Sequence, residues 1–119
     1  MSKELERQMV NAILNKIRTS RNNVFRIAKG RVKNQETLKE LEYTESNVKQ
    51  VIFELDADDC INSFKKDKEG FEGYVFEFGK EIEKREIYIK FRVLFEKDIC
   101  RLNCISFHFA NYKIKYLFK

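Results

Sequence analysis

The residues best suited to acid–base and phosphate chemistry lie in the second half of the chain, where polar and apolar side chains alternate. Tyr88 and Lys90 are separated by one residue, and His108, the only histidine, follows later. Histidine has an unperturbed pKa of about 6.5, so it can exchange a proton near neutral pH. A tyrosine beside cations is typical of a surface that holds a phosphate. These residue types predict a functional site wherever the fold brings them together.

The alternation indicates that strands position these residues. In residues 86–95 the odd-numbered positions are apolar, and the opposite face carries Tyr88, Lys90 and Arg92. One face of such a strand can cover a core while the other stays available for function. Three runs with this period predict antiparallel strands joined by short charged connections, over residues 74–82, 86–95 and 99–110.

The last of these runs changes phase along its length. Ile105, Phe107 and Phe109 are predicted to face the core, which places Ser106 and His108 on the face of Tyr88. Earlier in the run the apolar positions have the opposite phase, for which either a β-bulge or a partly covered second face would account. The residues with that phase are Cys100, Leu102 and Cys104.

In the first run the placement of Lys80 depends on Gly79. Strict alternation would put Lys80 on the same face as Phe76 and Phe78. A glycine within a strand often marks a bulge. We therefore predict a bulge at Gly79 that turns Lys80 outward, toward Tyr88.

The first half of the chain predicts helices. Apolar residues recur at helical spacing over residues 3–18 and 44–55, the second with Thr44 or Asn47 as N-cap. We expect a short strand over 23–28, a basic turn over 30–34 and an irregular loop over 56–73. The fold class is therefore α+β, one domain over residues 1–119, with N-terminal helices packed on one face of a small antiparallel sheet.

Charge is distributed unevenly in this chain of net charge +5. From Arg7 to Gln35 there is no acidic residue, a pattern typical of a surface that binds a polyanion. Within this stretch the predicted contacts to such a partner are Arg26, Lys29, Arg31 and Lys33. No apolar run is long enough to span a membrane, and the charged N-terminus does not resemble a signal peptide, so we expect a cytoplasmic protein.

The three cysteines predict small buried hydrophobes rather than ligands of a metal. Cys100, Cys104 and His108 are four residues apart, which separates them by about 13 Å along a strand, far more than one zinc ion can bridge. We expect no metal and no cofactor.

Four short runs carry a family resemblance. They are Phe78-Gly79-Lys80-Glu81-Ile82, Glu86-Ile87-Tyr88-Ile89-Lys90-Phe91, Cys104-Ile105-Ser106-Phe107-His108 and Tyr116-Leu117-Phe118-Lys119. With them the chain resembles the MqsR-type toxins of bacterial toxin–antitoxin pairs, most strongly over residues 73–119 and more weakly over 22–55. The resemblance implies a RelE-like fold, cleavage of mRNA, and neutralisation by a cognate antitoxin protein.

The resemblance assigns roles by position, with departures. Tyr88 matches the family's active-site tyrosine, whereas His108 stands where better-known members have a lysine. Those members also have a glutamine in the preceding strand, and residues 75–80 contain none. A further lysine of the family has no clear match here, with Asn62, Lys65 and Lys66 all near the expected place.

The mechanism that this implies is metal-independent attack of the ribose 2′-OH on the adjacent phosphorus. We expect His108 to act as general acid or base and Tyr88 to position the phosphate or stack on a base. A second proton-transfer group is needed, either a lysine or Tyr88. Lys80, Lys90 and Arg92 would hold the phosphate, with Ser106 and the basic stretch binding the rest of the RNA. The alternative is a module that binds RNA or protein through the same basic face without catalysis.

Overall fold

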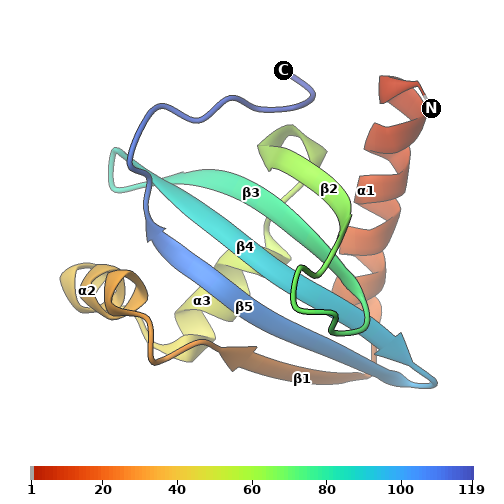
Figure 1. Ribbon diagram of the computed structural model, residues 1–119, viewed down its shortest axis with the longest axis horizontal. Coiled ribbons are helices and arrows are strands. Elements are labelled where there is room, and N and C mark those ends of the chain that lie inside the picture. The colour runs from red at the N-terminus through yellow and green to blue at the C-terminus, as the bar shows by residue number, and fades with distance from the viewer. Residues whose placement is uncertain (1) are drawn as a thin grey trace.

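A computed structural model describes residues 2–119 of the protein, in which three helices and a 3₁₀ turn accompany one five-stranded sheet (Figure 1). The order of the strands across the sheet is β1-β5-β4-β3-β2. Along the chain the elements are α1 (Lys3–Thr19), β1 (Asn22–Ile27), α2 (Val32–Leu41), α3 (Glu45–Phe53), η1 (Ala57–Asp59), β2 (Cys60–Lys66), β3 (Tyr74–Ile82), β4 (Arg85–Glu96) and β5 (Ile99–Phe109).

Helices α1 and α3 form where the sequence predicts them. Ser2 caps α1, because its side chain accepts a hydrogen bond from the backbone N–H of Leu5 at 3.1 Å. In α3 the cap is Thr44, which forms a capping box with Asn47. Both helices bury one apolar stripe, made of Val10, Leu14 and Ile17 in α1 and of Val48 and Ile52 in α3.

The sheet is larger than predicted, and it is mixed rather than antiparallel. The three predicted strands are confirmed as β3, β4 and β5, which pair antiparallel. The predicted strand over 23–28 is confirmed as β1, but it lies parallel to β5 at one edge. Strand β2 and η1 occupy much of the predicted loop 56–73. The predicted basic turn over 30–34 is wrong in its second half, because α2 begins at Val32.

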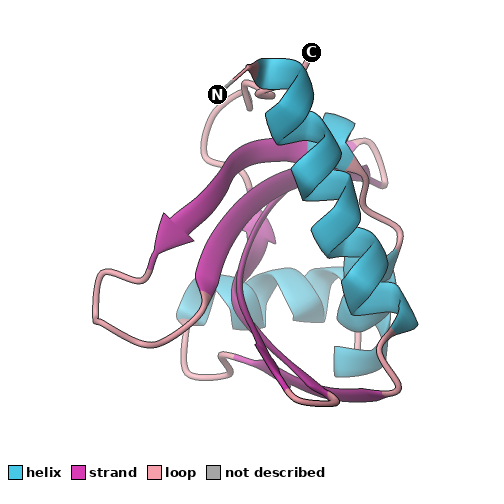
Figure 2. Ribbon diagram, turned by 90° about the vertical axis from the view of Figure 1, so that its right-hand side faces the viewer, coloured by secondary structure: helices cyan, strands magenta, loops and turns pink. Residues whose placement is uncertain are grey.

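One face of the sheet is covered by α1 and α3, as predicted. The core between them contains Phe76, Phe78 and Phe91, whose rings stack with centroids 5.4 Å apart for Phe78 and Phe91. Figure 2 shows α1 on one side of the sheet and the loop between β2 and β3 on the other. We call this second side the open face. Among the helices that the structure describes, none has the length and apolar character needed to cross a membrane.

A β-bulge in β5 explains the change of phase in its sequence. Phe91 pairs with Cys104, but the preceding residue, Lys90, pairs with Ser106. Ile105 is therefore the extra residue of the bulge. It lies on the side of the open face, so the prediction that it faces the core is wrong. Because of this insertion, Phe107 joins the same buried face as the earlier apolar positions.

Helix α2 holds the bulge through buried polar side chains. The amide of Asn34 donates to the carbonyl oxygens of Ala28 (3.1 Å) and Ile105 (3.0 Å) and accepts from the backbone N–H of Phe107 (2.9 Å). One turn later, Thr37 accepts from the N–H of Phe109 (3.2 Å). Since β1 pairs with β5 only as far as Cys104, these side chains replace a strand along the rest of that edge.

The C-terminal segment, residues 110–119, crosses the end of the open face. The hydroxyl of Tyr116 donates to Glu86 on β4 (3.0 Å), and the N–H of Leu117 donates to the carbonyl of Cys60 on β2 (2.8 Å). Close to these contacts, the side chains of Ile114 and Tyr116 lie directly over Gly79. The register of β3 on β4 continues without interruption through Gly79, so the predicted bulge there is wrong. The glycine instead makes room for the segment.

Replacement of Gly79 by alanine should therefore destabilise the protein. A Cβ at Gly79 would lie 2.7 Å from the Cδ1 of Ile114 and 2.9 Å from the hydroxyl of Tyr116. We expect a loss of about 1 kcal/mol in the free energy of unfolding, measured by urea denaturation, because the ends of the Ile114 and Tyr116 side chains must shift to make room. Gly30→Ala is the control, because a Cβ there meets nothing within 4 Å. Equal stability of the two variants would contradict this account of Gly79.

Asn34→Ala should be more damaging than its place on a surface helix suggests. Loss of the amide leaves the buried N–H of Phe107 without a partner, at a cost of about 1–3 kcal/mol for such a group. Asn34→Asp should also destabilise, because its second oxygen would face two carbonyl oxygens. The control is Glu36→Ala at an exposed position of the same helix. Urea denaturation and hydrogen exchange of the Phe107 amide test this; exchange as slow as in the unmodified protein would refute it.

Candidate active site

The open face brings together Tyr88 and His108, as the sequence predicts. They are directly paired across β4 and β5, and the centroids of their rings lie 5.4 Å apart at an angle of 36°. The next pair along the same face is Lys90 with Ser106, whose side chain is buried. Arg92 lies one step further along β4. The bulge at Ile105 is what makes this arrangement possible, because it turns Ser106 and His108 to the side of Tyr88.

The imidazole of His108 has one nitrogen committed and one available. Its Nδ1 lies 3.0 Å from the carbonyl oxygen of Phe109. A carbonyl only accepts hydrogen bonds, so Nδ1 carries a proton and Nε2 remains for a ligand. The ring lines a pocket of about 580 Å³, which we call the aromatic pocket. Its lining comprises Lys33, Ile61, Asn62, Glu77, Tyr88, His108 and residues 110–115.

Glu77 on β3 is the site residue that sequence reasoning missed. Its side chain is 16% exposed and is held on both oxygens. The hydroxyl of Tyr88 donates to Oε2, the amide of Asn62 donates to Oε1 at 2.8 Å, and the ammonium of Lys65 lies 3.4 Å from Oε1. The available signal was a glutamate alternating with phenylalanines on a strand next to that of Tyr88. Only the register of β3 on β4 shows that they meet.

This network shifts the pKa values of Tyr88 and Glu77 in opposite directions. Burial raises the pKa of Tyr88, and its hydrogen bond to the Glu77 carboxylate raises it further, so this phenol stays protonated at neutral pH. Burial alone would also raise the pKa of Glu77. The hydrogen bonds from Tyr88 and Asn62, together with the Lys65 charge, outweigh burial and lower that pKa below its ordinary value. Glu77 is therefore a carboxylate, and Tyr88 is a hydrogen-bond donor.

A second pocket of about 550 Å³ adjoins the first and is rich in cations. We call it the basic pocket. Glu77 lines both pockets, so they are neighbours on the open face, and we refer to the two together as the groove. The cations of the basic pocket come from three strands and two loops: Arg26, Arg31, Lys65, Lys66, Lys68, Lys90 and Arg92.

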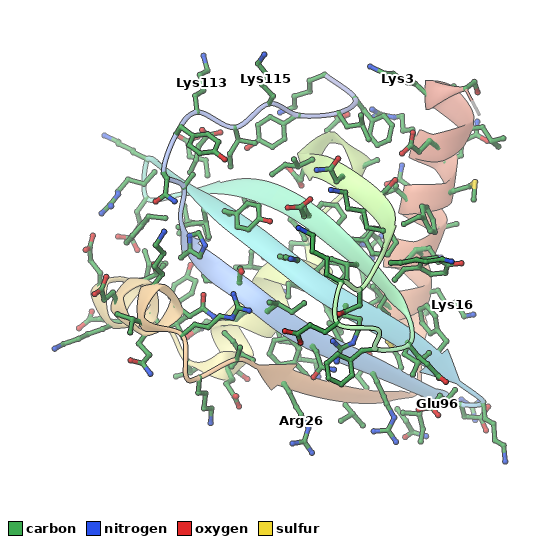
Figure 3. The ribbon with its side chains drawn as sticks, viewed as in Figure 1. Lys3, Lys16, Arg26, Glu96, Lys113 and Lys115 are labelled. Carbon is green, nitrogen blue, oxygen red and sulfur yellow. The ribbon has the colours of Figure 1, made fainter. Side chains whose placement is uncertain are left out.

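Of the four basic residues in the first half of the chain that were predicted to contact a polyanion, three line the two pockets. Arg26 and Arg31 line the basic pocket, and Lys33 lines the aromatic pocket. Lys113 and Lys115 project from the C-terminal segment beside the aromatic pocket, at the opposite end of the molecule from Arg26 (Figure 3). Lys29 is instead paired with Glu45 at 3.5 Å, and is not among the lining residues of either pocket.

Arg92 has a structural contact besides its place in the groove. It forms an ion pair with Asp67 at 3.0 Å, and its guanidinium lies 4.7 Å from the ring centroid of Phe71. The Arg92 and Asp67 side chains are only 18% and 9% exposed. Arg92 thereby fixes the loop between β2 and β3, which forms one wall of the basic pocket.

The structure corrects the predicted position of Lys80. Because β3 has no bulge at Gly79, Lys80 pairs with Ile87 and lies on the face opposite to Tyr88. Its ammonium is 3.4 Å from Asp59. Lys80 therefore has no access to a phosphate bound beside Tyr88 and His108.

The cysteines are all buried, as predicted. Cys100 and Cys104 point into the core, on the other side of the sheet from His108, so the three residues share no site. Within residues 2–119, no three His, Cys, Asp or Glu side chains are grouped in a way that could hold a metal ion.

The chain was compared with protein-family models, curated proteins and solved structures. No protein-family model matches the chain, and no curated protein and no solved structure matches it either. The chemistry of the groove therefore rests on its own residues.

Proposed function

We propose that the protein is a metal-independent endoribonuclease that cleaves mRNA in the cytoplasm. The observation that carries this proposal is the contact between Tyr88 and His108 in the aromatic pocket, which lies next to a pocket rich in cations. A basic groove attracts the phosphates of a nucleic acid, and aromatic side chains offer stacking surfaces for unpaired bases. A proton-transfer group beside them supplies what cleavage requires in addition to binding.

The biological role that we propose is that of the toxin in a toxin–antitoxin pair, with a RelE-like fold and a cognate antitoxin as protein partner. This part of the proposal rests on the resemblance of residues 73–119 to the MqsR-type toxins. The α+β order, with helices preceding the β3–β4–β5 meander, is compatible with it. A small neighbouring gene for an antitoxin, whose product forms a complex with this protein and blocks its activity, would support the role.

Cleavage of RNA tests the enzymatic proposal directly. Purified protein should cut single-stranded RNA in the presence of EDTA and leave 2′,3′-cyclic phosphate ends. His108→Ala should lower the rate by about 100-fold or more, because a positioned proton-transfer group contributes about that much. Lys39→Ala, an exposed change on α2 outside both pockets, is the control and should be as active as the unmodified protein.

A binding module without catalysis is the alternative, because the seven cations of the basic pocket would hold RNA even if nothing were cut. The unmodified protein would then bind RNA and leave it intact over the same incubation. Cleavage by His108→Ala at the unmodified rate would equally exclude the proposed site.

The groove should bind RNA with a strong dependence on salt. With a 2′-O-methyl RNA that resists cleavage, the logarithm of the affinity should fall linearly with the logarithm of the salt concentration. Arg31→Ala should reduce the slope by about 1, since it removes one phosphate contact from the basic pocket. The slope for Lys39→Ala should equal that of the unmodified protein. Equal slopes for both variants would place the RNA elsewhere.

A further inference from the structure

We propose that the carboxylate of Glu77 is the general base of the cleavage and that His108 is the general acid. This inference rests on the proposed function and identifies the second proton-transfer group that the reaction needs. It assigns Glu77 a role in chemistry, where the sequence indicated only a polar position on a strand.

Glu77 and His108 line the same pocket, the aromatic pocket. Glu77 on β3 and His108 on β5 both contact Tyr88 on the strand between them. The backbones of β3 and β5 are two strand spacings apart, about 10 Å, which two side chains and one phosphate can span. Glu77 also lines the basic pocket, so the cations that would hold the phosphates of RNA lie next to it.

The hydrogen bonds of Glu77 leave one acceptor position of its carboxylate unused. A carboxylate offers about four acceptor positions, and Asn62, Lys65 and Tyr88 use three of them. One position remains for the 2′-OH of a ribose. The same bonds fix the carboxylate in place, which avoids the loss of side-chain entropy when substrate binds.

Two other candidates for the base, Tyr88 and Lys80, are less suitable. The hydroxyl of Tyr88 donates a hydrogen bond to Glu77, and burial beside that carboxylate raises the pKa of Tyr88, so the phenolate is not formed near neutral pH. Lys80 is on the other face of the sheet. Tyr88 instead acts as a positioning residue that orients Glu77.

In the proposed step the proton of the ribose 2′-OH moves to the carboxylate of Glu77. The 2′-oxygen forms a bond to phosphorus while the bond from phosphorus to the 5′-oxygen breaks. The imidazolium of His108 gives its Nε2 proton to that leaving oxygen. The products are a 2′,3′-cyclic phosphate and a 5′-OH, and exchange of protons with water restores Glu77 and His108.

The pH dependence of this step depends on the charged groups around Glu77 and His108. The rate should rise with pH as the Glu77 carboxyl loses its proton. The titratable groups that line the two pockets with Glu77 and His108 include Lys33 from α2, Lys65 from β2, Tyr88 and Lys90 from β4, and Tyr112, Lys113 and Lys115 from the C-terminal segment.

A substrate with a better leaving group separates the base from the acid. We would compare a short RNA with the same RNA carrying sulfur in place of the bridging 5′-oxygen, because a thiolate leaves without a proton donor. Glu77→Gln keeps the size of the side chain and an oxygen for Tyr88, but it is no base. It should lower the rate by about 100-fold or more on both substrates. His108→Ala should be slow on the normal RNA and regain most of its rate on the sulfur substrate.

Glu81→Gln is the matched control. Glu81 is an exposed carboxylate on the same strand as Glu77, and it is not among the lining residues of either pocket. This variant should cleave both substrates as the unmodified protein does. Glu77→Asp, which moves the carboxylate back by one methylene, should be slowed but should keep the acidic limb of the pH–rate profile, and it serves if Glu77→Gln does not fold.

The pH profile distinguishes a base from a merely structural carboxylate. Because the Tyr88 hydrogen bond lowers the pKa of Glu77, Tyr88→Phe should shift the acidic limb to higher pH, and Glu77→Gln should abolish it. The inference is overturned if Glu77→Gln cleaves normally, if sulfur rescues it as it rescues His108→Ala, or if its acidic limb is unchanged. In each of those cases the endoribonuclease proposal stands. If the unmodified protein cleaves no RNA, both fail.

Discussion

The hydrogen bonds of the Asn34 amide to β5 are the constraint on which the open face depends. Side chains of a strand alternate, so an unbulged β5 that buries Cys100, Leu102 and Cys104 would also bury position 108. The bulge at Ile105 reverses this phase and brings His108 to Tyr88. A bulge leaves backbone groups without ladder partners, and here the Asn34 side chain binds both the Ile105 carbonyl and the Phe107 N–H. The buried Asn34 amide of helix α2 thus helps to determine which side chains of β5 lie in the site.

The sequence predicts those parts of the protein whose pattern reflects burial of apolar groups. Helices α1 and α3 and strands β3, β4 and β5 bury apolar side chains at regular spacing, so their existence and nearly all their bounds follow from periodicity. Helix α2 lacks such a pattern because the residues that it buries include Asn34 and Thr37, which are polar and face a strand edge. Strand β2 lacks it too, because its pairing with β3 is interrupted by two register shifts and Phe64 has a positive φ of 51°.

The site is predicted as far as single strands determine it. Tyr88, Lys90 and Arg92 follow from the alternation of β4 alone. Glu77 and Lys80 depend on facts that no local pattern contains: the register of β3 on β4, and the course of the C-terminal segment above Gly79. A glycine in a strand is compatible both with a bulge and with close approach of another segment. Here the second explanation holds, and it removes Lys80 from the site.

Strand β4 organises the groove through four successive outward positions. Glu86 binds Tyr116 and so anchors the C-terminal wall, whereas Arg92 binds Asp67 and anchors the loop that forms the other wall. Between them Tyr88 contacts Glu77 and His108, and Lys90 presents its charge. At about 3.3 Å per residue the two anchors are about 20 Å apart. Because a single strand sets this spacing, the two walls and the contact between Tyr88 and His108 keep fixed positions relative to one another. The carboxylate and guanidinium at its ends serve the architecture, which leaves the middle of the strand free for chemistry.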